Sequence, residues 1–439
     1  MFDARVATRF LVGFSLVLTA SCEPAEETPP PPAPTGGFGN AGGSSGNASG
    51  GNSGSAQGGD GGMSAGTGGT GGASACAEDC PAGGFCMAGE CKCPSDKTDV
   101  CDATCVSLQA SPEHCGTCSM ACDPGAACSM GVCGEAPAEL AKGTGCGAMR
   151  LALVGTDLYW TEADSGAVKT MPVTGGTPAD VATGQLKPLS IAADADGVYW
   201  ANEGDESAGS STVMKKALPL AAGAPVTLVT GTAADPESPV IKAIAVADST
   251  LYYTLVNDVR AISTDEAVTD DVVVGTATNL DIGMASGYPS GLAVDGTYVV
   301  WTTGIRSAIE RDDLLEGSDA YLELGESQGD VLWHNVASDG TNAYWATTTN
   351  IVTSALVKEA GGANTTLATT PDFKPITAFA IDAANVYFAN DGSIFKAPLG
   401  GGDPVIIARD QAAPSSMLVE GTTLYFATSD CAVRTLPLE

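Results

Sequence analysis

Hydrophobic and polar positions alternate in short runs through the C-terminal part of the chain, most clearly in residues 292–302, LAVDGTYVVWT. An apolar run, an Asp-Gly-Thr turn and a second apolar run ending on Trp301 are typical of a hairpin, because strand side chains alternate between faces and Asp-Gly favours a tight turn. Variants of this segment recur down the chain, and helical periodicity is absent. The pattern therefore predicts one hairpin used many times.

Each repeat ends its second apolar run on a pair of large side chains, such as Tyr344-Trp345, and the second member aligns the repeats. Successive anchors lie between 38 and 53 residues apart, the period of a four-stranded propeller blade. Rings on the two faces of one strand can each pack against a neighbouring blade, so we assign the anchors a structural role. The seven anchors are Trp160, Trp200, Tyr253, Trp301, Trp345, Phe388 and Phe426.

A carboxylate stands six positions before the anchor in most repeats. Short acidic side chains there suit a turn, since an aspartate can accept hydrogen bonds from the backbone N–H groups that follow it. We expect the aspartates to form turns rather than to catalyse a reaction. They are Asp194, Asp295, Asp339 and Asp382.

The fold class predicted is all-β, a seven-bladed β-propeller, with six blades as the alternative. Residues 306–326 fit the blade pattern poorly, so unit four, residues 292–326, is either a full blade or carries an insertion. The last repeat has room for three strands, and a stray strand around Leu140 would complete it, which removes an exposed sheet edge. Cys146 and Cys431 lie at the two ends of the repeats, and we expect a disulfide between them to close the ring.

The first 75 residues predict export and a tether. Residues 1–21 have two arginines before an apolar run too short to span a bilayer, the form of a secretory signal. The segment ending Leu18-Thr19-Ala20-Ser21-Cys22 resembles the lipobox of bacterial lipoproteins, which implies lipid attachment at Cys22; an ordinary signal peptide is the alternative. Residues 22–75 are rich in Pro, Gly and Ser with almost no apolar positions, so a disordered tether is predicted.

Residues 76–134 hold twelve cysteines and few large apolar residues, which indicates a module held by disulfides, six by count. Their connectivity is not readable from spacing. Residues 101–133 resemble the stigma-specific protein family, a cysteine-rich module of exported proteins of myxobacteria-like bacteria, through Cys115-Gly116-Thr117-Cys118 and the segment from Cys128 to Cys133. A zinc site at Cys115 and Cys118 beside His114 is the competing interpretation.

Residues 135–439 are predicted to form the propeller, and their blades resemble a known type. Tyr159-Trp160-Thr161-Glu162 is similar to the Tyr-Trp-Thr-Asp blades of secreted propellers and lipoprotein receptors. That resemblance covers roughly residues 137 to 439 and is of blade type alone. It implies a propeller and, in the receptors, six blades.

The negative net charge of the chain limits the classes of partner that it can bind. The chain has 19 basic and 52 acidic residues, a formal net charge of −33, and the propeller region alone has 15 basic and 39 acidic residues. Such a surface repels phosphate backbones and anionic lipid, so we expect no nucleic acid and contact with a membrane through the lipid anchor alone. An unknown protein or glycan is the expected partner of a monomer placed at the outer membrane or cell surface.

The sequence offers little for catalysis. Its two histidines are His114 in the cysteine module and His334, which we expect at a strand edge or in a loop. Histidine-dependent triads and metal centres are poorly supported, and no catalytic or metal-binding residues are assigned. Calcium is the one cofactor considered, at loops beginning Asn202-Glu203 and Asn390-Asp391. The favoured function is a non-catalytic binding or adhesion lipoprotein, and the alternative is a propeller lyase or hydrolase using carboxylates and a metal ion.

Overall fold

The computed structural model describes residues 80–438 with gaps at 88–89, 144, 205–209, 221, 233–240, 256–257, 266–271, 277–288, 296, 304–307, 314–321, 327–330, 357–363 and 372. The described residues fall in one compact unit, Gly71–Glu439. Among them no helix combines the length and the apolar character that a membrane crossing requires. The signal, Cys22 and the tether lie outside the described residues, so those predictions stay predictions.

The described part of the cysteine module contains three two-stranded sheets and one short 3₁₀ helix, η1 (Pro112–His114). Its disulfides are Cys80–Cys91, Cys93–Cys105, Cys101–Cys118, Cys115–Cys128 and Cys122–Cys133. Cys86 is disulfide-bonded as well, while Cys76 lies outside the described residues. The strands are β1 (Phe85–Met87), β2 (Glu90–Lys92), β3 (Asp99–Cys101), β4 (Thr104–Val106), β5 (Cys128–Ser129) and β6 (Val132–Cys133).

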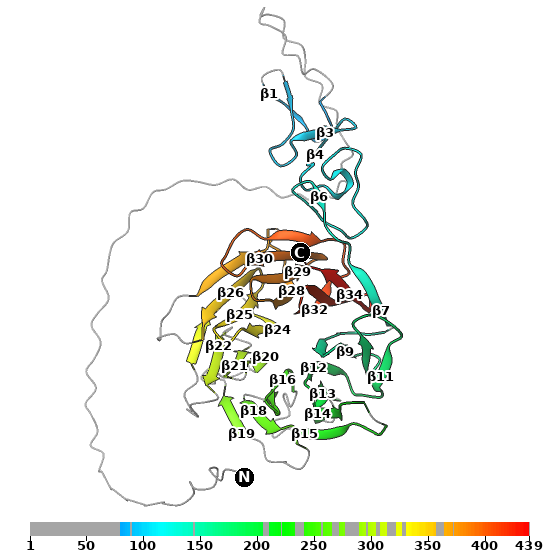
Figure 1. Ribbon diagram of the computed structural model, residues 1–439. Helices are drawn as coiled ribbons and strands as arrows, with labels where there is room; N and C mark the ends of the chain where they lie inside the picture. The colour runs from blue at the N-terminus through cyan, green and yellow to red at the C-terminus, as the bar shows by residue number, and fades with distance from the viewer. Residues whose placement is uncertain are drawn as a thin grey trace, which may run out of the picture. The chain divides into compact units, whose positions relative to one another are not determined.

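The remaining strands form seven four-stranded antiparallel sheets, arranged around a common centre as in a β-propeller (Figure 1). The innermost strands are β8 (Leu151–Val154), β12 (Pro188–Ala193), β16 (Ile244–Ala247), β20 (Pro289–Val294), β24 (Val331–Ser338), β28 (Ile376–Ile381) and β32 (Pro414–Glu420). The second strands, which carry the anchors, are β9 (Asp157–Glu162), β13 (Gly197–Asn202), β17 (Thr250–Leu255), β21 (Tyr298–Thr303), β25 (Asn342–Thr347), β29 (Asn385–Asn390) and β33 (Thr423–Thr428).

The outer half of each sheet completes the blade. The third strands are β10 (Ala167–Pro172), β14 (Ser210–Ala217), β18 (Asp258–Ser263), β22 (Ala308–Asp313), β26 (Asn350–Ala355), β30 (Ser393–Pro398) and β34 (Ala432–Pro437). The outermost strands are β11 (Ala179–Ala182), β15 (Val226–Thr232), β19 (Val272–Thr276), β23 (Leu322–Glu326), β27 (Thr365–Thr369), β31 (Val405–Ala408) and β7 (Ala138–Lys142). Unit four is thus a full sheet, because β22 and β23 supply its outer strands where an insertion was the alternative.

The core lies between blades, in seven buried clusters. In six of them, the tyrosine that precedes one anchor packs with the anchor of the next blade, as Tyr344 does with Phe388, and in the seventh Val300 packs with Trp345. The series ends where it began, since Tyr425 of the last blade shares a cluster with Trp160 of the first. All seven anchors are at most 2% exposed, which is the packing role assigned to them.

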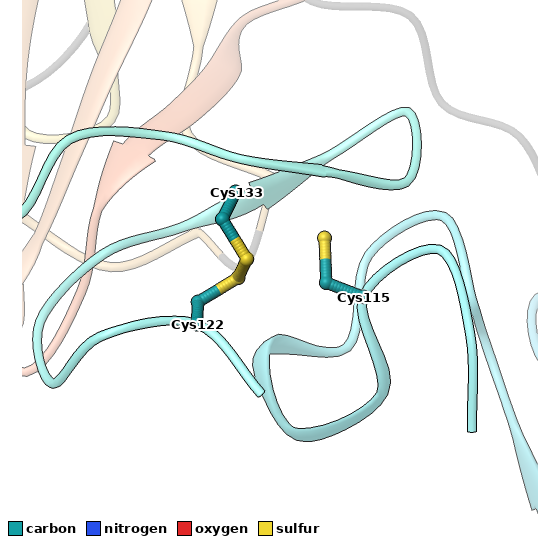
Figure 2. A group of neighbouring side chains, drawn as sticks. All are labelled: Cys115, Cys122 and Cys133. Carbon is teal, nitrogen blue, oxygen red and sulfur yellow. A yellow bond between two sulfur atoms is a disulfide. The ribbon is translucent and has the colours of Figure 1, made fainter. Parts of the chain in front are cut away.

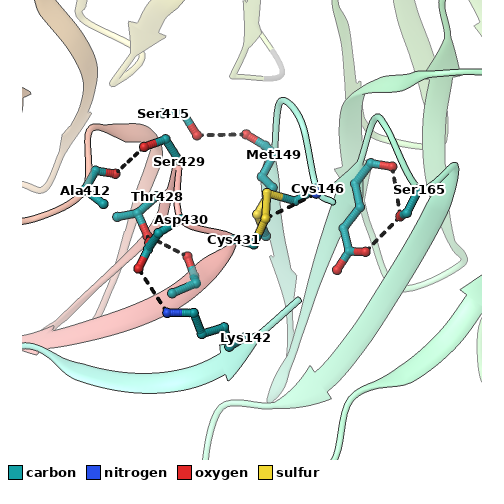
Figure 3. The surroundings of a disulfide bond; sticks show 12 residues. Lys142, Cys146, Met149, Ser165, Ala412, Ser415, Thr428, Ser429, Asp430 and Cys431 are labelled. Atoms are coloured by element: carbon teal, nitrogen blue, oxygen red, sulfur yellow. Dashed lines mark hydrogen bonds and ion pairs between the residues drawn. A yellow bond between two sulfur atoms is a disulfide. The ribbon is translucent and has the colours of Figure 1, made fainter. Parts of the chain in front are cut away.

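The ring closes with a strand from the N-terminal side, as expected. Strand β7 pairs antiparallel with β34, placing Ala141 opposite Val433 and Glu139 opposite Arg434. Cys146 and Cys431, which directly precedes β34, form a disulfide beside this seam (Figure 3). Asp430 accepts hydrogen bonds from Lys142 at 3.2 Å and from the Arg434 Nη2 group at 2.8 Å. A disulfide, the β-sheet pairing of β7 with β34 and the ion pairs of Asp430 therefore all stabilise the closure of the ring.

The module also contacts the propeller edge. Ala126 forms an isolated antiparallel bridge with Ala408 at the end of β31, and the Arg409 N–H donates to the Gly125 carbonyl at 3.0 Å. These contacts cover part of an outermost strand, which otherwise offers free backbone groups.

Candidate functional site

The predicted turn carboxylates have one shared geometry. In each case one carboxylate oxygen accepts the backbone N–H groups two and three residues later, at 2.6–2.9 Å. This is the turn-forming role expected from a short acidic side chain at the head of a hairpin. These aspartates therefore act in the fold as turn formers.

A tyrosine hydroxyl completes three of the turns. Tyr199 donates to Asp194 at 3.1 Å, Tyr344 to Asp339 at 2.6 Å and Tyr387 to Asp382 at 2.7 Å. Burial, reinforced by the neighbouring carboxylate, raises the pKa of Tyr344 to about 12. In unit four Val300 takes the tyrosine's place, and the Ser338 hydroxyl of the next blade donates to Asp295 instead.

The innermost strands share a second feature, a β-bulge near their beginning. In five of them the pairing register shifts near the start of the strand, before the residue that pairs with the anchor, as between Pro188 and Ser190 in β12. The segments preceding β8 and β16 behave alike, because Thr161 donates its N–H to the Arg150 carbonyl and Thr254 donates its N–H to the Ala243 carbonyl. Bulges turn side chains out of the regular sheet and are frequent beside binding sites.

A threonine directly after the anchor fixes the bulge in three blades. The Thr161 hydroxyl accepts the Arg150 N–H at 3.1 Å, and the Thr302 hydroxyl accepts the Gly291 N–H at 2.8 Å. Thr254 accepts two bulge N–H groups, those of Lys242 and Ala243, at 3.2 and 3.1 Å. The threonine of the Tyr-Trp-Thr pattern therefore satisfies backbone donors that the bulge leaves without a ladder partner.

Every bulge carries at least one polar residue. The innermost strands surround the common centre (Figure 1). Because all seven sheets have the same strand order, these strands start at the same end of the ring, and we call the polar positions at their bulges the inner bulge ring. Two of its described side chains are basic, Arg150 from the first blade and Lys242 from the third. The ring comprises Arg150, Ser190, Lys242, Ser290, His334, Asn335, Thr377, Ser415 and Ser416.

Hydrogen bonds from these residues join neighbouring blades. The Ser190 hydroxyl accepts the Ile244 N–H at 3.2 Å, and the Ser416 hydroxyl accepts the Leu151 N–H at 3.1 Å. The Arg150 Nη1 group donates to the Met149 and Ser415 carbonyls at 2.9 and 3.0 Å, and Figure 3 shows Met149 and Ser415 together at this seam. Burial lowers the pKa of Arg150 and that of Lys242, although the charge of Glu203 acts in the opposite direction on Lys242.

The connectors that lead into the innermost strands are held at the same end. The Gln411 N–H donates to the Gly392 carbonyl at 2.8 Å, and a Cβ on Gly392 would lie 2.5 Å from the Gln411 carbonyl oxygen. Gly392 also has φ +86°, so glycine is required there for two reasons. The hairpin turn between second and third strands thus fixes the connector.

The inner bulge ring was not identified from sequence, although the signal was present. Counting back one to three positions from the residue that pairs with each anchor gives a polar residue in every repeat. His334, expected at a strand edge or in a loop, occupies strand β24 at a ring position. Its side chain lies outside the described ones.

The competing zinc interpretation does not fit the cysteines. The sulfur atoms of Cys115, Cys122 and Cys133 lie within 4.8 Å of one another, but Cys122 and Cys133 are joined to each other (Figure 2) and Cys115 to Cys128. Cys118 is bonded to Cys101, and His114 Nδ1 lies 2.8 Å from the Cys118 carbonyl oxygen. Thiolate ligands are therefore absent at Cys115 and Cys118.

The two loops considered for calcium carry ion-paired carboxylates. Glu203 lies 3.6 Å from the Lys187 ammonium, and Asp391 pairs with Lys374. A cation would have to displace a lysine at each loop, and calcium binding stays a prediction.

The class of protein that this architecture defines is the β-propeller. No protein-family model matches the chain, and no curated protein matches it. Several solved structures do match the chain. The chain is similar to a catalytically inactive histidine-to-alanine variant of virginiamycin B lyase from Staphylococcus aureus, solved with quinupristin, at 12% identity and TM-score 0.52 over 69% of this chain and 99% of that one.

Two further structures show the same fold. A streptogramin B lyase matches at 11% identity and TM-score 0.53, over 69% of this chain and 97% of that chain. The WD40 β-propeller domain of Doa1 matches at 12% identity and TM-score 0.52, again over 69% and 97%. The chain is equally similar to two lyases and to a WD40 domain, so these similarities establish the fold alone.

Proposed function

We propose that this protein is an exported lipoprotein, attached through Cys22, whose propeller is a non-catalytic binding or adhesion module. The observation that carries the proposal is the inner bulge ring, where each of the seven blades has a polar residue at the bulge of its innermost strand in a ring closed by a disulfide. Disulfides throughout the module and at the seam support an oxidising compartment outside the cytoplasm. The partner is a protein or glycan met at this end of the ring.

The experiment compares two exposed threonines. Thr377 is an exposed member of the inner bulge ring, and Thr365 is an exposed residue of the outermost strand β27 in the neighbouring blade. Partners are first recovered by cross-linking at the cell surface and by glycan-array binding. Thr377→Tyr should reduce binding at least about 10-fold through steric obstruction, whereas Thr365→Tyr should leave it unchanged. Equal binding by both variants would place recognition elsewhere and contradict the proposal.

A second candidate function is a lyase or hydrolase that uses carboxylates and a metal ion. It is favoured by one observation, the position of His334, the one histidine of the propeller region, on the inner bulge ring. The test measures lactone hydrolysis after metal depletion and after addition of Ca²⁺ or Mg²⁺. Metal-dependent turnover that His334→Gln abolishes would replace the binding proposal, and partner binding without turnover would remove the enzyme.

A further inference from the structure

Arg150 presents a positive charge that the surrounding chain does not neutralise. Its Nη1 group is bound by two neutral carbonyl oxygens, those of Met149 and Ser415. Among the ion pairs of the described residues, Arg150 takes part in none, whereas Lys142, Lys169 and Arg434 all pair with carboxylates. A half-buried guanidinium bound by carbonyls alone retains its full charge in a poorly solvated place, which is costly unless an anion binds there.

Lys242 brings a second cation to the same end of the ring. Its backbone N–H is held by Thr254, which fixes the bulge that positions the residue, and the residue is partly buried. Ser190 of the second blade lies between the blades of Arg150 and Lys242, and its hydroxyl accepts the Ile244 N–H, so its own proton is available to donate. Two cations with a hydroxyl donor between them are a suitable lining for a group with several oxygen acceptors.

Building on the proposed function, we propose that the inner bulge ring binds the compact oxyanion of a small ligand, a carboxylate, phosphate or sulfate, through Arg150 with Lys242 contributing. The rest of the propeller limits the size of this ligand. With 39 acidic residues against 15 basic ones, its long-range field opposes the approach of any polyanion. A ligand with one anionic group loses little to that field and gains the local contacts.

The test titrates the intact protein with inorganic phosphate, sulfate and acetate, one at a time, and measures binding by calorimetry and by chemical-shift changes. The probes separate tetrahedral oxyanions from carboxylates. Arg150→Gln retains a donor for the neighbouring carbonyls but removes the charge, and Lys242→Met retains chain length. Each should weaken binding of the preferred anion about 10-fold or more, the usual size of a lost charge-assisted hydrogen bond.

Lys169→Met is the matched control, because it changes the net charge equally while Lys169 pairs with Asp180 on the outer part of the first blade. It should bind the anion as the wild type does. Wild-type affinity in Arg150→Gln, or equal weakening in Lys169→Met, would overturn the inference. So would lowered stability of Arg150→Gln with anion affinity intact, since Arg150 would then only join the first and last blades. If no anion binds but a neutral partner is lost in Thr377→Tyr, this inference fails and the proposed function stands.

Discussion

Tyr425 of the last blade and Trp160 of the first blade are buried in one cluster, at 6% and 2% exposure, and the Cys146–Cys431 disulfide lies in the same cluster. The same kind of aromatic contact occurs between five other pairs of neighbouring blades, and between the fourth and fifth blades Val300 takes the place of the tyrosine. At this seam alone, however, the sheet is completed by a strand from the opposite end of the domain. Ring closure thus depends on ordinary packing plus a covalent bond that spans 285 residues.

We therefore predict that Cys146→Ala/Cys431→Ala destabilises the propeller by up to about 5 kcal/mol, because the unfolded chain regains the entropy of a very long loop. The measurement is urea unfolding of the double variant beside the wild type under non-reducing conditions. A loss below about 1 kcal/mol would mean that the β7–β34 ladder and the Asp430–Arg434 pair hold the seam without the disulfide.

The anchors should matter for stability rather than for binding. Trp301 is fully buried between the third and fourth blades, so Trp301→Ala is expected to cost about 3–5 kcal/mol of unfolding free energy. Phe373 is 76% exposed and provides the control, with Phe373→Ala expected to change stability by about 0.5 kcal/mol or less. Chemical denaturation of both variants checks this, and similar losses in the two would contradict it.

Sequence patterning was informative wherever one physical requirement recurs. Trp301 and Asp295 could be assigned to packing and turns because each blade needs the same buried ring and the same capped hairpin. The strand around Leu140 could be placed because the last repeat was one strand short. The inner bulge ring was missed because its members differ chemically, from Arg150 to Ser190 to Lys242, and only the shared backbone irregularity brings them into register.

The predicted attachment of the protein to a membrane depends on Cys22. Cys22→Ser should abolish lipid attachment, so the protein should move from the membrane fraction to the soluble exported fraction while its propeller stays folded. Fractionation with metabolic labelling by a fatty-acid analogue measures both effects. Cys146→Ala/Cys431→Ala is the control, since it also removes cysteines, leaves no unpaired thiol of this pair and should retain the label. Unchanged membrane association of Cys22→Ser would favour an ordinary signal peptide.

The aspartate–tyrosine turns should make stability depend on pH at both extremes. The pKa of Tyr344 is raised to about 12 in the folded protein, so the unfolded state loses that proton first, from about pH 10. The stability that this group contributes is complete below about pH 10 and is lost as the pH rises toward 12.

At the acidic extreme, burial raises the pKa of Asp382, but hydrogen bonds from Ala384, Tyr387 and Asn385 outweigh burial and hold that pKa below its usual value. Its contribution is present above about pH 4 and is lost as the pH falls below that.

Variants at these turns separate the two effects. Tyr344→Phe should flatten the loss of stability between pH 10 and 12, because the ionisable hydroxyl is gone, at a cost of about 1 kcal/mol near neutrality from the missing hydrogen bond to Asp339. Asp382→Ala should cost more at pH 7 than at pH 3, since it leaves the Ala384 and Asn385 N–H groups and the Tyr387 hydroxyl without their acceptor. Thermal unfolding at stepped pH measures both. A Tyr344→Phe profile that falls as steeply as the wild type above pH 10 would show that other groups control the alkaline transition.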